Sequence, residues 1–167
     1  MKTVGFQEVD KQLQCLDMKD DRHVFKRHNK TLLLYHLVFP IKYRRSVLIP
    51  EVEKTLKETC LLIGEFYEMN FVEIGADSNH VHFLVQGVPS MAVSVMVSKI
   101  KSITGREIFR KHPEIKKALW GGNLWTSGFY ANTVGQYGNE AMIRNYIEKQ
   151  GDSYVKFHEG QLKMFDD

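Results

Sequence analysis

Two histidines at alternate positions of one predicted strand are the first side chains that could do chemistry. His80 and His82 lie in the apolar run 80–86, which has the composition of a strand. Positions i and i+2 of a strand point to the same face, so both imidazoles can reach one metal ion. Imidazole suits Mn, Zn, Co or Ni, and a catalytic ion keeps positions open for water and a phosphate oxygen. The alternative is a pair of partly exposed histidines on an ordinary strand.

Tyr146 and Gln150 form a second pair, four residues apart on a predicted helix that begins near Asn139. Residues with this spacing share one face of a helix. The Gln150 oxygen could therefore help to bind an ion near which the Tyr146 phenol attacks. A phenol has a reference pKa of about 10, so this attack depends on a strongly polarised electrophile such as a metal-bound phosphate. The alternative is a tyrosine that packs between the helix and the sheet.

The charge is distributed unevenly along the chain. The formal net charge of +3 does not by itself indicate nucleic acid. Residues 91–120, however, contain seven basic and two acidic side chains, a net charge of +5. Such a segment suits a phosphate backbone, because binding releases condensed counterions, or it is a solvated helix face. The candidate DNA-binding residues belong to this segment and to the turn after residue 41: Lys42, Arg44, Arg45, Lys99, Lys101, Arg106 and Arg110.

Four aromatic side chains lie at the end of the basic segment and after it. They either stack bases of a single strand or pack in the core, which is the default for large aromatic residues. These residues are Trp120, Trp125, Phe129 and Tyr130.

Composition excludes several classes of protein. A chain of 167 residues with 43% hydrophobic and 26% charged residues is typical of one globular domain, not of a disordered or repeat protein. Cys15 and Cys60 have neither disulfide-framework nor zinc-site spacing, which indicates a reducing compartment. The chain shows no signal peptide or membrane span, so we expect a cytoplasmic protein without a membrane partner. It has no glycine-rich phosphate loop, so we expect no nucleotide cofactor.

The predicted elements form the order β-α-β-β-α-β, followed by one more helix. Apolar or alternating runs predict four strands, and helical periodicity predicts three helices that start at Pro50, Ser90 and Asn139. The strands are expected at 31–39, 70–75, 80–86 and 129–134, and the helices at 50–69, 90–111 and 139–150. This order predicts an α+β, ferredoxin-like (RRM-like) fold: a four-stranded antiparallel sheet, two helices on one face, and a C-terminal helix that carries Tyr146.

The face of such a sheet that carries no helices stays open and commonly carries the site. The chain is expected to have one domain with two flanking segments. Residues 1–30 would form a partly helical N-terminal arm, residues 31–151 the catalytic domain and residues 152–167 a C-terminal tail.

Five segments, in this order, resemble the HUH single-tyrosine transposases of bacterial insertion sequences, the family that moves DNA as single strands. They span roughly residues 31–151. A single His-x-His pattern is weak, whereas five ordered segments are specific. The segments are Tyr35-His-Leu-Val-Phe-Pro-Ile-Lys-Tyr-Arg-Arg45, Asn79-His-Val-His-Phe-Leu-Val85, Lys99-Ile-Lys-Ser-Ile-Thr-Gly105, Leu124-Trp-Thr-Ser-Gly-Phe-Tyr-Ala-Asn-Thr-Val-Gly135 and Tyr146-Ile-Glu-Lys-Gln150.

The resemblance implies a role for each candidate residue. His80, His82 and Gln150 would bind a divalent metal, Mg or Mn, and Tyr146 would be the nucleophile. The enzyme would be a homodimer with shared active sites, the histidines coming from one subunit and the tyrosine helix from the other. It would recognise hairpins in single-stranded DNA at element ends. Tyr146 would cleave a phosphodiester to give a 5′-phosphotyrosine and a free 3′-hydroxyl, and a second 3′-hydroxyl would resolve that bond without ATP.

The chain departs from the family pattern in two places. The family usually has Asp directly before the first histidine, whereas this chain has Asn79, with Asp77 two residues earlier. The segment ahead of the first predicted strand is also longer than the family leads us to expect.

Other functions stay open at this point. Within the same chemistry, the chain could be a domesticated, repeat-associated relative or another HUH nuclease such as a replication initiator. A non-catalytic ferredoxin-like nucleic-acid-binding module would bind DNA in EDTA and after Tyr146→Phe. A small metal-dependent phosphoesterase would turn over a soluble substrate without a covalent protein intermediate.

Overall fold

The structure, a computed structural model, describes residues 23–120 and 122–135. The chain divides into two units, residues 1–32 and residues 33–167. In the first unit, β1 (Val24–Lys26) and β2 (Asn29–Thr31) form an antiparallel hairpin. The sequence predicts a partly helical arm here and misses this hairpin, because strands of three residues are too short to show alternation. The rest of that arm, the predicted helix 139–150 and the predicted tail lie outside the described residues.

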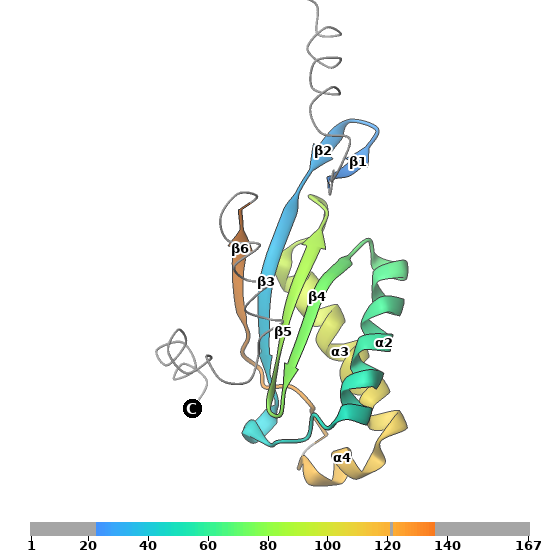
Figure 1. The fold of residues 1–167 in the computed structure, drawn as a ribbon, viewed down its shortest axis with the longest axis vertical. Helices are drawn as coiled ribbons and strands as arrows, with labels where there is room; N and C mark the ends of the chain where they lie inside the picture. Colours follow the sequence, from blue (N-terminus) through green and yellow to red (C-terminus); the bar gives the residue numbers. More distant parts are fainter. Residues whose placement is uncertain (1–22, 121, 136–167) are drawn as a thin grey trace, which may run out of the picture. The chain divides into compact units, whose positions relative to one another are not determined.

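The second unit contains a four-stranded antiparallel sheet (Figure 1). Its spatial order is β4-β5-β3-β6, so the first and third strands of the unit lie in the centre. This is the strand order of the split βαβ motif, and the predicted ferredoxin-like fold is confirmed. The strands are β3 (Leu33–Pro40), β4 (Asn70–Asp77), β5 (His80–Gly87) and β6 (Tyr130–Val134).

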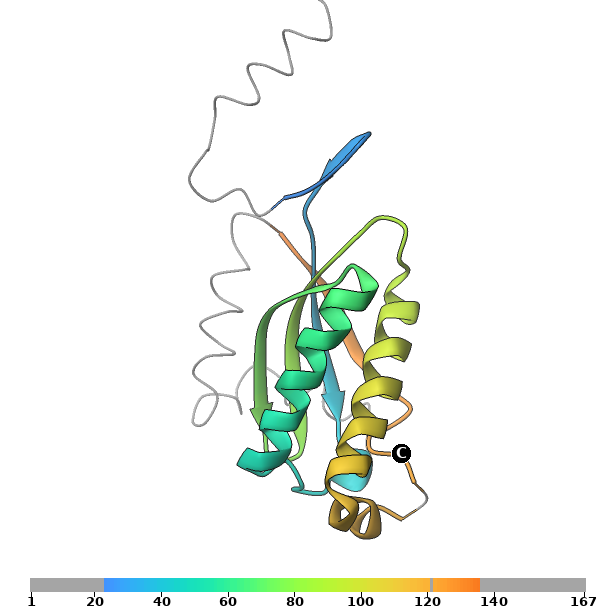
Figure 2. The same cartoon turned by 90° about the vertical axis from the view of Figure 1, so that its right-hand side faces the viewer.

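Two long helices cover one face of this sheet, α2 (Pro50–Tyr67) and α3 (Val93–Lys111), as Figure 2 shows. Pro50 occupies the first turn of α2, with Glu51 and Glu53 beside it, which suits the positive end of the helix dipole. The sequence predicts a start at Ser90 for α3, but the helix begins at Val93. No helix in the described part of the chain is long and apolar enough to cross a membrane.

A short helix, α4 (Pro113–Ala118), follows α3 directly. The sequence predicts the end of α3 at His112-Pro113 correctly but misses α4. Proline cannot continue a helix, yet it suits the first turn of a new one. Pro113 therefore marks the end of α3 and also begins α4.

The hydrophobic core lies between the sheet and the two long helices. Alternation along the central strands directs Leu37 and Phe39 of β3 and Phe83 of β5 into this core, and none of the three is exposed. The aromatic rings of Phe39 and Phe83 pack at a centroid distance of 5.0 Å. The residues that alternate with these three along β3 and β5 point to the opposite face of the sheet, where the candidate histidines lie.

Candidate active site and basic groove

The candidate metal ligands His80 and His82 lie on the face of the sheet opposite the helices. Val81 and Phe83, their neighbours in β5, pack into the core, so alternation turns both imidazoles to the other side. The ring centroids are 5.1 Å apart. His80 is 3% exposed and His82 is not exposed at all, which does not fit the alternative of two partly exposed strand histidines.

Both imidazoles are hydrogen-bonded through Nδ1. The Nδ1–H group of His80 donates to Oδ1 of Asn79 at 2.7 Å. Nδ1 of His82 lies 3.0 Å from Nε2 of His36. A histidine that ligates a metal usually hydrogen-bonds in this way through its other ring nitrogen, which fixes the tautomer and the ring orientation. The donor set therefore fits a divalent ion bound through the two Nε2 atoms.

His36 is a component of this site that the sequence analysis does not identify. It lies in β3, two residues before Val38, the residue directly opposite His82. The two rings are nearly coplanar, with a centroid distance of 5.2 Å and an interplanar angle of 18°. The edge of Tyr130 in β6 lies against the His36 ring at 5.9 Å. The sequence signals of His36 are its polar side chain within the apolar run 32–41 and its place in the first of the five family-like segments, 35–45.

The described residues supply only part of a metal site. Across residues 23–120 and 122–135, no three side chains of His, Cys, Asp or Glu come together as a complete set of ligands. Asp77 pairs with His80 across the β4–β5 ladder, but its carboxylate accepts a hydrogen bond from the backbone N–H of Ser78. Gln150, the predicted third ligand, and Tyr146, the predicted nucleophile, lie outside the described residues.

The basic turn after β3 lies at the same end of the sheet as His80. Pro40, the last residue of β3, is opposite His80, and the N–H of Ile41 donates to the carbonyl of Asn79 at 2.8 Å. The turn continues as the 3₁₀ helix η1 (Lys42–Arg44). The backbone of Tyr43 is left-handed, with φ of 58°, and its side chain is 61% exposed. Such a conformation costs about 1–2 kcal/mol for a residue other than glycine.

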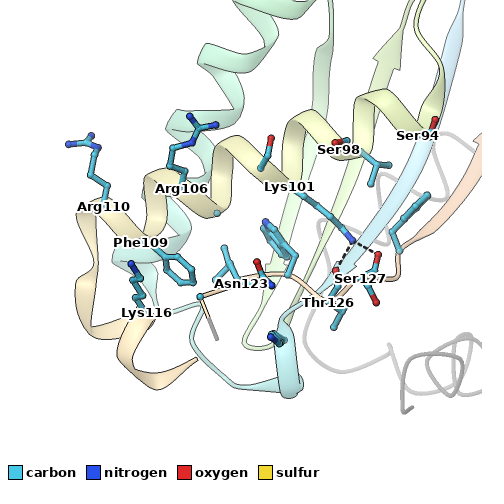
Figure 3. A pocket seen from close by; sticks show the side chains of 18 residues that line it. Ser94, Ser98, Lys101, Arg106, Phe109, Arg110, Lys116, Asn123, Thr126 and Ser127 are labelled. Atoms are coloured by element: carbon cyan, nitrogen blue, oxygen red, sulfur yellow. Dashed lines mark hydrogen bonds between the residues drawn. The ribbon is translucent and has the colours of Figure 1, made fainter. Parts of the chain in front are cut away.

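A basic groove of about 1150 Å³ lies between α3, α4 and the segment 122–129 (Figure 3). Five basic side chains line it, and none of its lining residues in the described part of the chain is acidic. Four of them are predicted DNA-binding residues. The fifth, Lys116 of α4, is not among the predicted DNA-binding residues, although it belongs to the segment of net charge +5. The five are Lys42, Lys101, Arg106, Arg110 and Lys116.

The other three predicted DNA-binding residues do not line this groove. Arg44 and Arg45 lie at the neighbouring turn, where Arg45 is exposed. Lys99 is on α3, and its ammonium group lies 4.0 Å from the centre of the Tyr67 ring of α2. The structure therefore brings together Lys42, Lys101 and the two arginines of α3, but not the whole predicted set.

Lys101 holds one wall of the groove. Its ammonium group donates to the carbonyls of Thr126 and Ser127 at 2.9 and 3.3 Å (Figure 3). It also donates to the carbonyl of Gly128 at 2.6 Å. Three bonds use all three of its N–H donors. The group also lies over the ring of Phe39, 5.2 Å from its centre. Burial disfavours the charged form and lowers the pKa of Lys101 to about 8.

The four aromatic residues at the end of the basic segment and after it have different environments. Trp125 belongs to the core, and its indole N–H donates to the Thr104 hydroxyl at 3.0 Å. Trp120 is 78% exposed, and Phe129 lines the groove with 37% of its surface exposed. Tyr130 contacts His36 instead. Of the four, Trp120 and Phe129 are exposed, Tyr130 is partly buried and Trp125 is buried.

The ferredoxin-like sheet, the buried histidine pair on the face opposite the helices and the basic groove fit the class of the HUH single-tyrosine transposases. A family model described as "Transposase IS200 like" matches residues 29–150, and the chain belongs to this family. The resemblance inferred from five sequence segments is confirmed.

Relatives support the same assignment. The ISDra2 transposase TnpA of Deinococcus radiodurans is 35% identical over 120 residues, which cover 72% of this chain and 85% of that protein. The transposase for insertion sequence element IS200 of Salmonella typhimurium is 27% identical over 123 residues, covering 74% of this chain and 80% of that protein.

Solved structures show the same fold. The crystal structure of a Deinococcus radiodurans R1 transposase matches with a TM-score of 0.63 and 31% identity, over 76% of this chain and 97% of that one. A REP-associated tyrosine transposase bound to a REP hairpin matches with a TM-score of 0.53 over 74% of this chain and 69% of that one. Its identity of 14% supports the fold alone.

Proposed function

We propose that this transposase cleaves and rejoins single-stranded DNA at element ends through a covalent bond to Tyr146. Membership of the IS200-like family supports transposition as the activity. The observation that carries the chemical part of the proposal is the buried histidine pair, whose Nδ1 atoms are engaged by Asn79 and His36. Such an arrangement is costly to maintain for packing alone and is the usual one for histidines that bind a metal.

The proposed metal ligands are His80, His82 and Gln150. A bound divalent ion, Mg or Mn, would polarise the scissile phosphate and favour departure of the leaving oxygen. His80 and His82 would each offer Nε2, because their Nδ1 atoms are engaged elsewhere. Gln150 would add a neutral amide oxygen.

In the proposed reaction, Tyr146 is the nucleophile. Its phenolic oxygen loses its proton and forms a bond to the phosphorus of a phosphodiester while the bond to the 3′ oxygen breaks. The leaving oxygen takes up a proton, so the number of protons is unchanged. The products are a 5′-phosphotyrosine and a free 3′-hydroxyl. A second 3′-hydroxyl then attacks the phosphotyrosine, which restores a phosphodiester and the tyrosine. One bond replaces another in each step, so no nucleotide cofactor is needed.

The proposed DNA surface comprises the groove and the basic turn after β3. The groove has five basic side chains and an accessible aromatic ring, Phe129, a combination that suits single-stranded DNA. Lys42 lines the groove two residues after Pro40, the residue opposite His80, so the groove begins at the end of the sheet where His80 lies. Hairpins are the proposed recognition element, since a protein of the same fold is bound to a REP hairpin. We further propose a homodimer in which the tyrosine helix of one subunit serves the histidines of the other.

The test is formation of a covalent protein–DNA adduct. Labelled single-stranded DNA that carries the hairpins flanking the gene is incubated with the protein, with Mn, with Mg or in EDTA, and resolved under denaturing conditions. We expect an adduct that requires the metal and is lost in Tyr146→Phe and in His80→Ala. Tyr67→Phe, a tyrosine of α2 on the helical side of the molecule, is the matched control and should form the adduct normally.

The same experiment separates the alternatives. Tight DNA binding without an adduct in any metal, beside an active control transposase, would favour a non-catalytic binding module. An adduct that persists in Tyr146→Phe would assign the nucleophile to another residue. Cleavage of DNA without any covalent intermediate would favour a metal-dependent phosphoesterase.

A further inference from the structure

We infer that His36 is a positioning residue that sets the ring tautomer of His82. The inference rests on the proposed function, because it concerns the nitrogen that His82 would offer to a metal. His36 is 4% exposed, and its Nε2 lies 3.0 Å from Nδ1 of His82. The two rings are also nearly coplanar, with an interplanar angle of 18°. His36 therefore fixes both the plane of the His82 ring and the environment of one of its nitrogens.

The hydrogen bond between two neutral imidazoles has two possible directions. In the first, Nδ1–H of His82 donates to Nε2 of His36, and Nε2 of His82 carries the lone pair that a metal needs. In the second, Nε2–H of His36 donates to Nδ1 of His82, and Nε2 of His82 carries the hydrogen instead. Only the first direction permits metal binding through Nε2. His36 must then act as the acceptor and keep its own hydrogen on Nδ1.

The surroundings of His36 favour a positioning role over the role of a third ligand. Its Nε2 is directed at the His82 ring, and the three histidines do not form a metal-binding group within the described residues. The edge of the Tyr130 ring lies against the His36 ring at an angle of 74°, which limits its rotation. β3 lies between β5 and β6, so His36 is held in the centre of the sheet.

The test compares two substitutions at position 36. His36→Phe keeps an aromatic ring but removes the acceptor, and His36→Gln keeps an acceptor without the ring. We measure the dissociation constant of Mn²⁺ in the absence of DNA, by electron paramagnetic resonance and calorimetry. His36→Phe should weaken binding about 10- to 100-fold, the usual effect of losing such a partner, and His36→Gln should recover most of the affinity. Nitrogen-15 spectra of the metal-free proteins then report the His82 tautomer, which His36→Phe should change and His36→Gln should preserve.

A matched control comes from the helical side of the molecule. His112 also uses Nε2 to contact a neutral partner, the Thr55 hydroxyl at 2.8 Å, so His112→Gln should leave both readouts unchanged. Thermal midpoints in EDTA verify that each variant is folded.

Each outcome has one meaning. Equal Mn²⁺ affinity and an unchanged tautomer in His36→Phe would overturn the inference. An equal loss of Mn²⁺ affinity in both variants, with the His82 tautomer preserved, would also overturn it. Such a result would mean that His36 contributes only through packing. If the parent protein binds no Mn²⁺, the proposed metal site fails. The nitrogen-15 spectra then decide the role of His36 independently: loss of the Nδ1–H tautomer in His36→Phe supports it, and no change overturns it.

Discussion

At the scale of single residues, the two candidate ligands differ in what orients them. His82 faces another imidazole, whereas His80 faces the amide oxygen of Asn79. A carboxylate in place of that amide would make a charge-assisted hydrogen bond, which is shorter and about twice as strong. It would also raise the basicity of the His80 ring as a ligand. Asn79 therefore gives this chain a weaker partner for His80 than the Asp that the family usually has.

This difference predicts that Asn79→Asp raises the affinity for Mn²⁺. We expect a gain of about three- to tenfold, smaller than the usual effect of deleting such a partner altogether. Calorimetric titration of the metal into DNA-free protein measures it. Ser78→Asp adds the same charge one residue earlier, at an exposed position, and controls for general electrostatic attraction. An equal gain in both variants would contradict the specific role of residue 79.

Some residues of the site could be predicted from the sequence and others could not. Alternation on a strand is enough to place His80 and His82 on one face, and the structure has them there. His36 could not be found in this way, because its partner is 46 residues away in the chain and only the pairing of β3 with β5 brings them together. Net charge located the basic groove, but it could not distinguish Lys101, which binds three carbonyls, from residues that face the solvent.

At the scale of elements, Lys101 joins α3 to the segment that leads into β6. The charge that forms this connection is also one of the five positive charges of the groove. Burial lowers the pKa of Lys101 to about 8, so the ammonium form dominates at pH 7 and the neutral amine at pH 9. Deprotonation removes one positive charge and one of the three N–H donors.

We therefore expect DNA binding by the parent protein to weaken as the pH rises through about 8. The expected change from pH 7 to pH 9 is about two- to fivefold, the range for one partly screened ion pair. Fluorescence anisotropy with a labelled DNA hairpin at constant ionic strength measures it. Lys101→Met should bind more weakly at pH 7 and lose most of this pH dependence. Lys116→Met, which removes a different charge from the same groove, should keep it; a flat profile in the parent protein would refute the prediction.

Elements could be predicted where they are long and regular. The four strands of the sheet and the two long helices follow from alternation and helical periodicity, with ends that differ by a few residues. The β1–β2 hairpin and α4 could not be predicted, since each is too short for a periodic pattern. Prolines marked boundaries correctly at Pro50 and Pro113, although the second also begins a helix.

At the scale of the whole molecule, a single core connects the sheet to both long helices. Cys60 of α2 lies in this core with none of its surface exposed, and burial raises the pKa of its thiol. Both effects protect it from alkylation, because the thiolate is the reactive form. Cys60 is therefore a probe of unfolding on the helical side of the sheet.

In a Cys15→Ser background, we expect iodoacetamide to label Cys60 only through global unfolding. Phe83→Ala, on the opposite side of the core, should lower the free energy of unfolding by about 3–5 kcal/mol and accelerate labelling by the corresponding factor. Urea denaturation gives the free energy independently. Leu61→Ala, next to Cys60 but 63% exposed, should change either quantity little. If Phe83→Ala leaves the labelling rate of Cys60 unchanged, Cys60 is exposed by local opening of α2 and not by global unfolding.

The position of β3 in the sheet also has a consequence for synthesis on the ribosome. Leu33 pairs with Gly87, but on the other edge Leu34 pairs with Val134, a hundred residues later. At ordinary translation rates, several seconds separate the emergence of β5 from that of β6. If β3 pairs with β5 during that interval, the nascent chain has His36 beside His82 while the second edge of β3 has no strand to pair with. A transcript that stops early would release this intermediate permanently, and a bare strand edge pairs readily with other chains. Truncated copies of the gene should therefore yield aggregating products.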